Sequence, residues 1–179
     1  NPASLMLGAG ATFYGRTIDT DPKHMQEVFL AAAAHQGCSF IEVFQNCVIF
    51  NDKVHDNHTN RKTRDDTTIR VKDGAPMIFG KEKNKGLVLD GFSPKVVSLD
   101  DEGVSEDQLI VHREKDYNNA GMLCGLRGPD YPVPLGIIRK VEEPVYDQQV
   151  SSQLDEVLKK KGKGNCKTLL SSGETWEVK

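Results

Sequence analysis

The strongest constraint on the fold is a segment with helical periodicity that lies between two apolar segments near the start of the chain. Residues 11–16 and 39–44 are apolar segments of strand length, and residues 21–36 between them have helical periodicity. Asp21 suits the N-cap of this helix, and Pro22 suits its first turn. The pattern predicts a βαβ unit with two parallel strands and a right-handed crossover.

The segment that follows the second predicted strand contains a cysteine between polar residues. Gln45–Asp52 comes directly after residues 40–44, which we expect to form a buried strand. Ligands bind beyond the carboxyl ends of parallel strands, so Cys47 is placed like a ligand or a nucleophile. Alternatively, Cys47 is a small buried residue that caps a core, because free cysteines are often buried. From the residues alone, both interpretations stay open.

The composition changes after this segment. Residues 52–70 are rich in Asp, Asn, Lys, Arg and His, which predicts an exposed loop or a partly ordered excursion, and a natural boundary. We expect His55 and His58 there to be solvated, because a metal site needs supporting groups that an exposed loop lacks. Short apolar pieces further on predict a small β appendage followed by mixed structure. The expected elements are strands at 76–79, 86–89, 95–99 and 134–141 and helices at 118–126 and 149–161.

Size and charge restrict the class of protein. A chain of 179 residues with a net charge of −3 can bury one modest core with an appended lobe. The mild acidity argues against a nucleic-acid partner, and no apolar run approaches the roughly 20 residues that cross a bilayer. The first residues lack a basic segment followed by an apolar core, so we expect no signal peptide, no membrane partner and a cytoplasmic location.

The cysteines do not form a metal motif among themselves. Cys38, Cys47, Cys124 and Cys166 are widely spaced and include no Cys-x-x-Cys, which excludes a zinc ribbon or a self-contained cluster site. A disulfide scaffold is not expected for a cytosolic chain of this size. Only Cys47 has polar neighbours that suggest a function, and the other cysteines are interpreted as structural or incidental.

Segments along nearly the whole chain resemble one family. These segments are Asn1-Pro2, Leu7–Phe13, His24-Met25, His35–Gly37, Gln45–Asn51, Pro134–Arg139 and Gly173–Val178. With them, the chain is similar to the β subunit of 2-oxoacid:ferredoxin oxidoreductases, and its ending resembles the 2-oxoglutarate-specific branch. The match is dense only through Asp52.

The resemblance implies an α/β fold in two parts. Residues 1–52 would be the C-terminal part of a thiamine diphosphate-binding parallel-sheet domain, and residues 53–179 a small mixed α+β C-terminal extension. Family members carry a Cys-x-x-Cys and a Gly-Asp-Gly-Asp segment upstream of the Asn-Pro that opens this chain. We therefore expect the C-terminal portion of a longer β subunit, inactive alone, with an exposed sheet edge and apolar face.

The resemblance also implies a reaction and its cofactors. The expected activity is oxidative decarboxylation of 2-oxoglutarate with coenzyme A to acyl-CoA and CO2, with electrons passing through a [4Fe-4S] cluster to ferredoxin. Thiamine diphosphate and Mg²⁺ would be bound largely outside this chain. Cys47 matches the family's remote fourth ligand to the cluster iron. Asn46, Phe50 and Asn51 would surround the cluster. Catalytic acid or base residues are not identified by the sequence.

Other assignments remain open. The expected partners are the α subunit, the upstream half of the β subunit, ferredoxin, the 2-oxoacid and coenzyme A. A pyruvate-specific or other 2-oxoacid branch of the family is an alternative, because the residues that discriminate substrates are not recognised here. If the chain is complete as given, a non-catalytic assembly module is a further alternative, because its βαβ unit lacks the strands to cover itself.

Overall fold

The chain folds into two compact units. The computed structural model describes residues 1–101, 104–174 and 176–178. The two units are Asn1–Glu143 and Pro144–Lys179. Among the described residues, no helix is both long enough and apolar enough to cross a membrane.

A mixed four-stranded sheet forms the centre of the first unit. Its strand order is β2 (Ser39–Phe44), β1 (Phe13–Ile18), β7 (Val133–Lys140) and β3 (Thr68–Arg70). Strands β1 and β2 are parallel, as the βαβ pattern predicts, and β3 is parallel to β7. The predicted α/β class is confirmed. The sheet is mixed because β7 runs antiparallel to β1.

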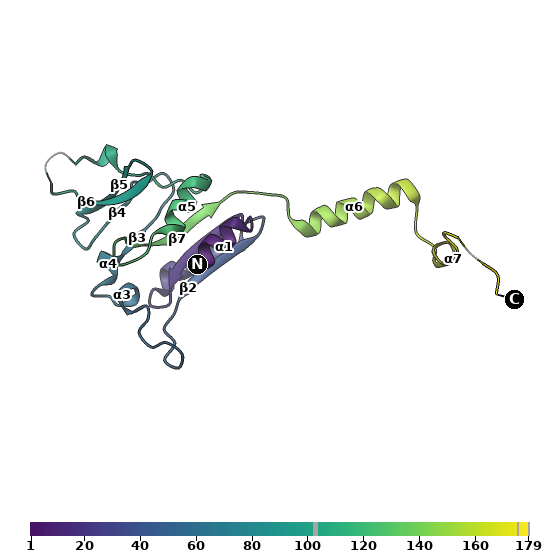
Figure 1. The fold of residues 1–179 in the computed structure, drawn as a ribbon, viewed down its shortest axis with the longest axis horizontal. Helices are drawn as coiled ribbons and strands as arrows, with labels where there is room; N and C mark the ends of the chain where they lie inside the picture. Colours follow the sequence, from purple (N-terminus) through teal and green to yellow (C-terminus); the bar gives the residue numbers. More distant parts are fainter. Residues whose placement is uncertain (102–103, 175, 179) are drawn as a thin grey trace. The chain divides into compact units, whose positions relative to one another are not determined.

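Helices cover both faces of β1. Helix α1 (Pro2–Gly8) and helix α5 (Tyr117–Gly125) pack together on one face, and α2 (Pro22–Ala33) packs on the other. Alternate side chains of a strand point to opposite faces. Helix α1 contacts both β1 and β2, and Figure 1 shows it in front of β2. All six residues of β1 are consequently buried.

Helix α2 forms where the sequence predicts a helix. The Asp21 side chain accepts a hydrogen bond from the backbone N–H of His24 at 3.2 Å, which caps the first turn. The helix ends at Ala33, before the predicted end at residue 36. Only part of its expected apolar face is buried, because Phe29 is 47% exposed.

Strand β2 differs from the expectation for residues 40–44. It lies at the edge of the sheet, with β1 as its single neighbour, and its residues are half-buried or exposed. The prediction of a buried strand was wrong, because an edge strand has no second neighbour to cover it. The open edge of β2 and the exposed Phe29 agree with the expected exposed edge and apolar face.

Residues 52–70 are more ordered than the composition suggests. They form α3 (Asp56–Thr59), α4 (Arg64–Thr67) and β3. Thr59 and Ile69 are 8% and 0% exposed. The alternative of an exposed loop was therefore wrong for this part, whereas a partly ordered excursion agrees with these short elements. Strand β3 is held by long-range pairing with β7 that no local pattern reveals.

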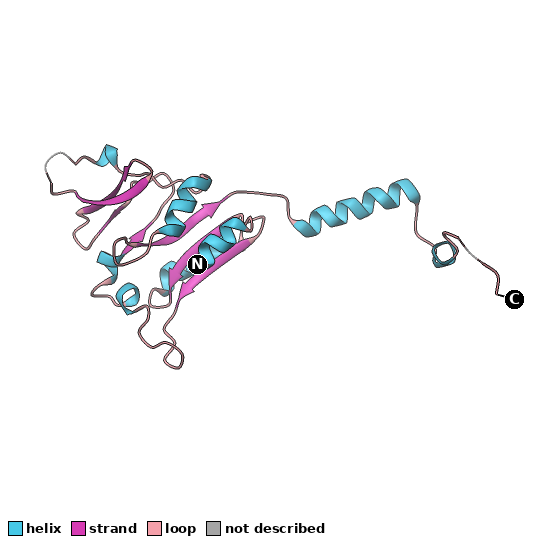
Figure 2. Cartoon of the chain, in the orientation of Figure 1, coloured by secondary structure: helices cyan, strands magenta, loops and turns pink. Residues whose placement is uncertain are grey.

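The predicted β appendage is confirmed as a small antiparallel sheet. It contains β4 (Ile78–Phe79), β5 (Lys85–Asp90) and β6 (Ser93–Ser98), in that order, drawn in magenta in Figure 2. A short 3₁₀ helix, η1 (Glu106–Gln108), follows. The four-stranded sheet combines strands from both sides of residue 52, and the domain division at that residue stays a prediction.

The described residues of the second unit form two helices. Helix α6 (Tyr146–Lys161) is capped by Gly162, whose φ of +76° suits glycine, and α7 (Cys166–Leu170) follows. The prediction of a helix over 149–161 is confirmed. The apolar residues Leu154, Val157 and Leu158 of α6 are 46–59% exposed.

One apolar cluster joins the two sheets of the first unit. Leu123 of α5 is fully buried in it, together with Tyr14 of β1 and Leu87 of β5. Truncation of a leucine at such a position removes apolar contacts and leaves a cavity.

We predict that Leu123→Ala lowers the free energy of unfolding by about 2–5 kcal/mol. Denaturant unfolding of the full-length protein that contains this chain measures the change. Leu5→Ala is the matched control, because Leu5 lies in α1 and is 70% exposed. Equal losses from both substitutions would contradict the assignment of Leu123 to the core.

Candidate functional site

The Cys47 loop, residues 45–54, leaves the sheet at the carboxyl end of β2. Cys47 and Asn51 form an isolated antiparallel bridge, in which the Asn51 N–H donates to the Cys47 carbonyl at 3.0 Å. Cys47 itself is exposed. The interpretation of Cys47 as a buried core residue was therefore wrong, because the chain turns outward beyond Phe44 instead of returning to the core.

The Asn46 side chain joins the two ends of the Cys47 loop through hydrogen bonds. Its Nδ2 donates to Oδ1 of Asp52 at 3.0 Å, and its Oδ1 accepts from the backbone N–H of Lys53 at 2.7 Å. The Asn46 N–H donates to Oδ2 of Asp19 at 3.4 Å, which ties the turn to the end of β1. Lys53 has a φ of +62°, an uncommon value for a residue other than glycine. These contacts fix the loop before any ligand binds.

Backbone N–H groups face the Cys47 sulfur. The N–H of Phe50, followed by those of Ile49 and Asn51, stabilises the thiolate and lowers the pKa of Cys47 below its usual value. A thiolate is the form that binds metal ions and acts as a nucleophile. The predicted site residues Asn46, Phe50 and Asn51 thus all lie in the turn around Cys47, although Phe50 contributes its backbone and not its ring.

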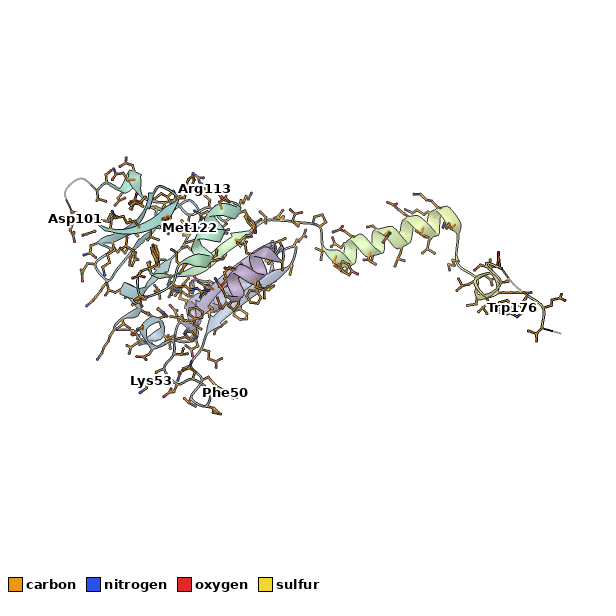
Figure 3. The ribbon with its side chains drawn as sticks, in the orientation of Figure 1. Phe50, Lys53, Asp101, Arg113, Met122 and Trp176 are labelled. Atoms are coloured by element: carbon orange, nitrogen blue, oxygen red, sulfur yellow. The ribbon has the colours of Figure 1, made fainter. Side chains whose placement is uncertain are left out.

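The tip of the Cys47 loop is apolar. Val48, Ile49 and Phe50 are 74%, 83% and 90% exposed. Figure 3 shows Phe50 at the far end of the loop, away from the sheets. Consecutive exposed apolar side chains beside a reactive thiol are typical of a surface that another protein segment covers.

The other cysteines lie in different surroundings. Cys38 and Cys166 are exposed, whereas Cys124 is buried in α5, and burial raises the pKa of its thiol to about 11. Within the described ranges, no group of three His, Cys, Asp or Glu residues is arranged to hold a metal ion.

A pocket of about 810 Å³ lies on the α1 and α5 side of the sheet. Its wall includes Arg16, Glu42, Phe44, His55 and His58. Arg16 and Glu42 occupy paired positions of β1 and β2, and their side chains form an ion pair at 2.7 Å. The sequence interpretation missed this pair. The available signal was one charged residue within each of two apolar strands, since a buried charge requires a partner.

The two histidines of this wall were expected to be solvated, which is wrong for both. His55 stacks on the Phe44 ring with centroids 4.5 Å apart and planes inclined by 4°. His58 is half-buried, and its Nδ1 has no hydrogen-bond partner within the described residues. Burial lowers the pKa of His58, and the nearby His55 and Arg16 lower it further. Neutral His58 therefore predominates at neutral pH.

Sequence comparisons relate the chain to enzyme subunits, although no family model matches it. The chain is 34% identical over 183 residues to the 2-oxoglutarate oxidoreductase subunit KorB of Mycobacterium tuberculosis, covering 99% of this chain and 48% of that protein. It is also 38% identical over 52 residues to the 2-oxoacid:ferredoxin oxidoreductase β subunit of Saccharolobus solfataricus, covering 29% of this chain and 17% of that subunit.

A solved structure has the same fold. The 2-oxoglutarate:ferredoxin oxidoreductase from Magnetococcus marinus, with 2-oxoglutarate, coenzyme A and succinyl-CoA bound, matches with a TM-score of 0.59 and 18% identity. The match covers 97% of this chain and 45% of that chain.

These comparisons confirm the predicted resemblance. The chain is related to the C-terminal part of the β subunits of 2-oxoacid:ferredoxin oxidoreductases. The 2-oxoglutarate oxidoreductase subunit KorB matches 99% of the chain, and the chain spans about half of the length of that relative.

We predict that Cys47 is alkylated faster than Cys38 at neutral pH, by about threefold or more, in full-length protein stripped of bound metal. The lowered pKa of Cys47 lets its thiolate form earlier as pH rises, so its reaction rate levels off at a lower pH than that of an ordinary free thiol. Iodoacetamide labelling followed by peptide mass spectrometry at pH 6–9 measures both rates. Buried Cys124 serves as the protected control. A Cys47 rate that rises with pH in the same way as that of an ordinary free thiol would contradict thiolate stabilisation by the loop.

Proposed function

We propose that this chain is the C-terminal part of the β subunit of a 2-oxoglutarate:ferredoxin oxidoreductase. The complete enzyme would convert 2-oxoglutarate and coenzyme A to succinyl-CoA and CO2 and pass the electrons to ferredoxin. The observation that carries the proposal is 34% identity to KorB along 99% of the chain. The ligands of the Magnetococcus marinus enzyme provide support for the substrate and for coenzyme A.

We further propose that Cys47 is a ligand of a [4Fe-4S] cluster. Thiolates are the usual ligands of such clusters, and one of them can come from a distant part of the chain. Cys47 suits the role of a cluster ligand, because its thiol is exposed, has a lowered pKa and lies in a turn that is held by hydrogen bonds. Hydrogen bonds to cluster sulfurs tune the reduction potential, and the backbone of residues 49–51 offers such donors. When bound, the cluster supplies one-electron transfer.

The residues of the chain itself would hold and shield this group. Asn46 fixes the two ends of the turn, so that the Cys47 sulfur keeps one position during electron transfer. Val48, Ile49 and Phe50 would exclude water once another segment covers them, and low solvent exposure is one of the factors that set a cluster potential.

We also propose that the other cofactors are bound mainly by parts of the enzyme outside this chain. Thiamine diphosphate and Mg²⁺ would bind mainly to the upstream half of the β subunit and to the α subunit. A single thiolate supplies one of the four ligands that the cluster requires, so the upstream half of the β subunit would supply the rest.

We predict that Cys47→Ala abolishes the iron–sulfur visible absorption of the full-length β subunit assembled with its α subunit. Ferredoxin reduction that depends on 2-oxoglutarate and coenzyme A should fall by roughly a hundredfold or more, because electrons lose their exit path from the active site. Absorption spectra, iron content and steady-state turnover measure the effect.

Cys38→Ala is the matched control for this experiment. Cys38 is also exposed and lies just before β2, whereas Cys47 lies just after it. The control should keep its cluster and its turnover. A Cys47→Ala enzyme with full iron content and unchanged turnover would refute the proposed ligand while leaving the family relationship intact.

A further inference from the structure

Arg16 is a charged residue at the floor of the 810 Å³ pocket. It is only 4% exposed, and its Nε donates to Oε2 of Glu42 at 2.7 Å. The same carboxylate oxygen accepts from the Tyr14 hydroxyl at 2.6 Å. Burial raises the pKa of Tyr14, so the hydroxyl remains a donor at neutral pH. One oxygen of Glu42 thus receives two hydrogen bonds and anchors Arg16.

The hydrogen bond to Glu42 uses only one of the N–H donors of Arg16. A guanidinium group carries five N–H donors, and its two terminal nitrogens hold four of them. Within the described residues, those terminal nitrogens donate no hydrogen bond, although Arg16 lines the pocket. These nitrogens are not among the fully buried polar atoms that lack a partner, so they are open to the pocket, where the oxygens of a ligand can accept their hydrogen bonds.

Aromatic rings fix the plane of the guanidinium. Its central carbon lies 5.6 Å from the Tyr14 ring centroid and 5.4 Å from that of Phe44. The Phe44 ring is itself stacked on His55, which restrains it in turn. A planar donor fork held in one orientation suits the paired oxygens of a carboxylate or a phosphate.

The charges of the pocket favour an anion at Arg16 in particular. Lys85 also lines the pocket, but its Nζ lies 3.1 Å from Oδ1 of Asp66 and is neutralised there. Glu42 is likewise occupied by Arg16 and Tyr14. Arg127 and Asp130 also line the pocket but are exposed, whereas Arg16 is buried, so a further negative group gains most at the terminal nitrogens of Arg16. His58, with its unpartnered Nδ1, offers a neutral hydrogen-bonding position on the same wall.

We propose that this pocket binds a small molecule through a carboxylate or phosphate group held by the terminal nitrogens of Arg16. The volume lies within the range of roughly 300–1,000 Å³ that is typical of ligand sites. The body of the ligand lies along Phe44, His55 and Tyr131. This site concerns the pocket alone, and its occupancy does not depend on a cluster at Cys47.

Two probes distinguish the possible sources of the anionic group. Isothermal titration of the full-length β subunit, assembled with its α subunit, uses succinate as a free dicarboxylate and inorganic phosphate as a phosphate. We expect at least one probe to bind. Arg16→Lys keeps the positive charge but loses the planar pair of N–H donors of the guanidinium, so it should weaken that binding by roughly tenfold to a hundredfold. A preference for succinate indicates an organic acid, and a preference for phosphate indicates a phosphorylated compound.

Arg139→Gln is the matched control. Arg139 also lies over an aromatic ring, that of Tyr117 at 5.3 Å, but it is on β7 and does not line the pocket. It should leave binding unchanged. If Arg16→Lys does not fold, Arg16→Gln combined with Glu42→Gln removes both partners of the ion pair and leaves no unpaired charge.

A selenate soak of wild-type crystals locates the anion without any variant. An anomalous selenium peak within hydrogen-bond distance of the Arg16 terminal nitrogens supports the site. No such peak, or another segment of the enzyme covering these nitrogens, overturns the proposal. Equal binding of the preferred probe by wild type and Arg16→Lys, or no binding of either probe by the wild type, also overturns it.

Discussion

The complete burial of β1 is the constraint on which the first unit depends. Its six residues are covered by α2 on one face and by α1 and α5 on the other, and both its edges are paired. Polar groups on such a strand need partners within the protein or in a cavity that the strand lines. The Nε of Arg16 donates to Glu42 in the neighbouring register position, and Thr17 forms a 2.9 Å hydrogen bond to His24. Polar side chains of β1 therefore form hydrogen bonds to both β2 and α2.

The local parts of the fold could be predicted from the sequence because their signals are local. Asp21 and Pro22 mark the start of α2, and Gly162 marks the end of α6. Strand β2 has the predicted bounds. By contrast, β3 has three residues and exists because it pairs with β7, more than sixty positions further along the chain. Sequence periodicity carries no information about that pairing.

The candidate site was predictable to a similar extent. Cys47 stood out because it follows a strand of a βαβ unit, and the structure places it in a braced, exposed turn with a lowered thiol pKa. The pocket could not be predicted, because it requires β1, β2, α3 and the segment after α5 to meet. A continuous apolar strand pattern also hides Arg16 and Glu42, which are charged but face one another and not solvent.

The Cys47 loop and the Arg16 pocket share one aromatic contact. Phe44 precedes the loop and His55 follows it, and their stacked rings close the loop at its base, as in compact loops whose ends lie near each other. The face of the Phe44 ring also receives the Arg16 guanidinium. An anion that fixes Arg16 would therefore restrain Phe44 and, through it, the base of the loop that carries Cys47. Phe44 thus contributes both to the wall of the pocket and, through its contact with His55, to the base of the Cys47 loop.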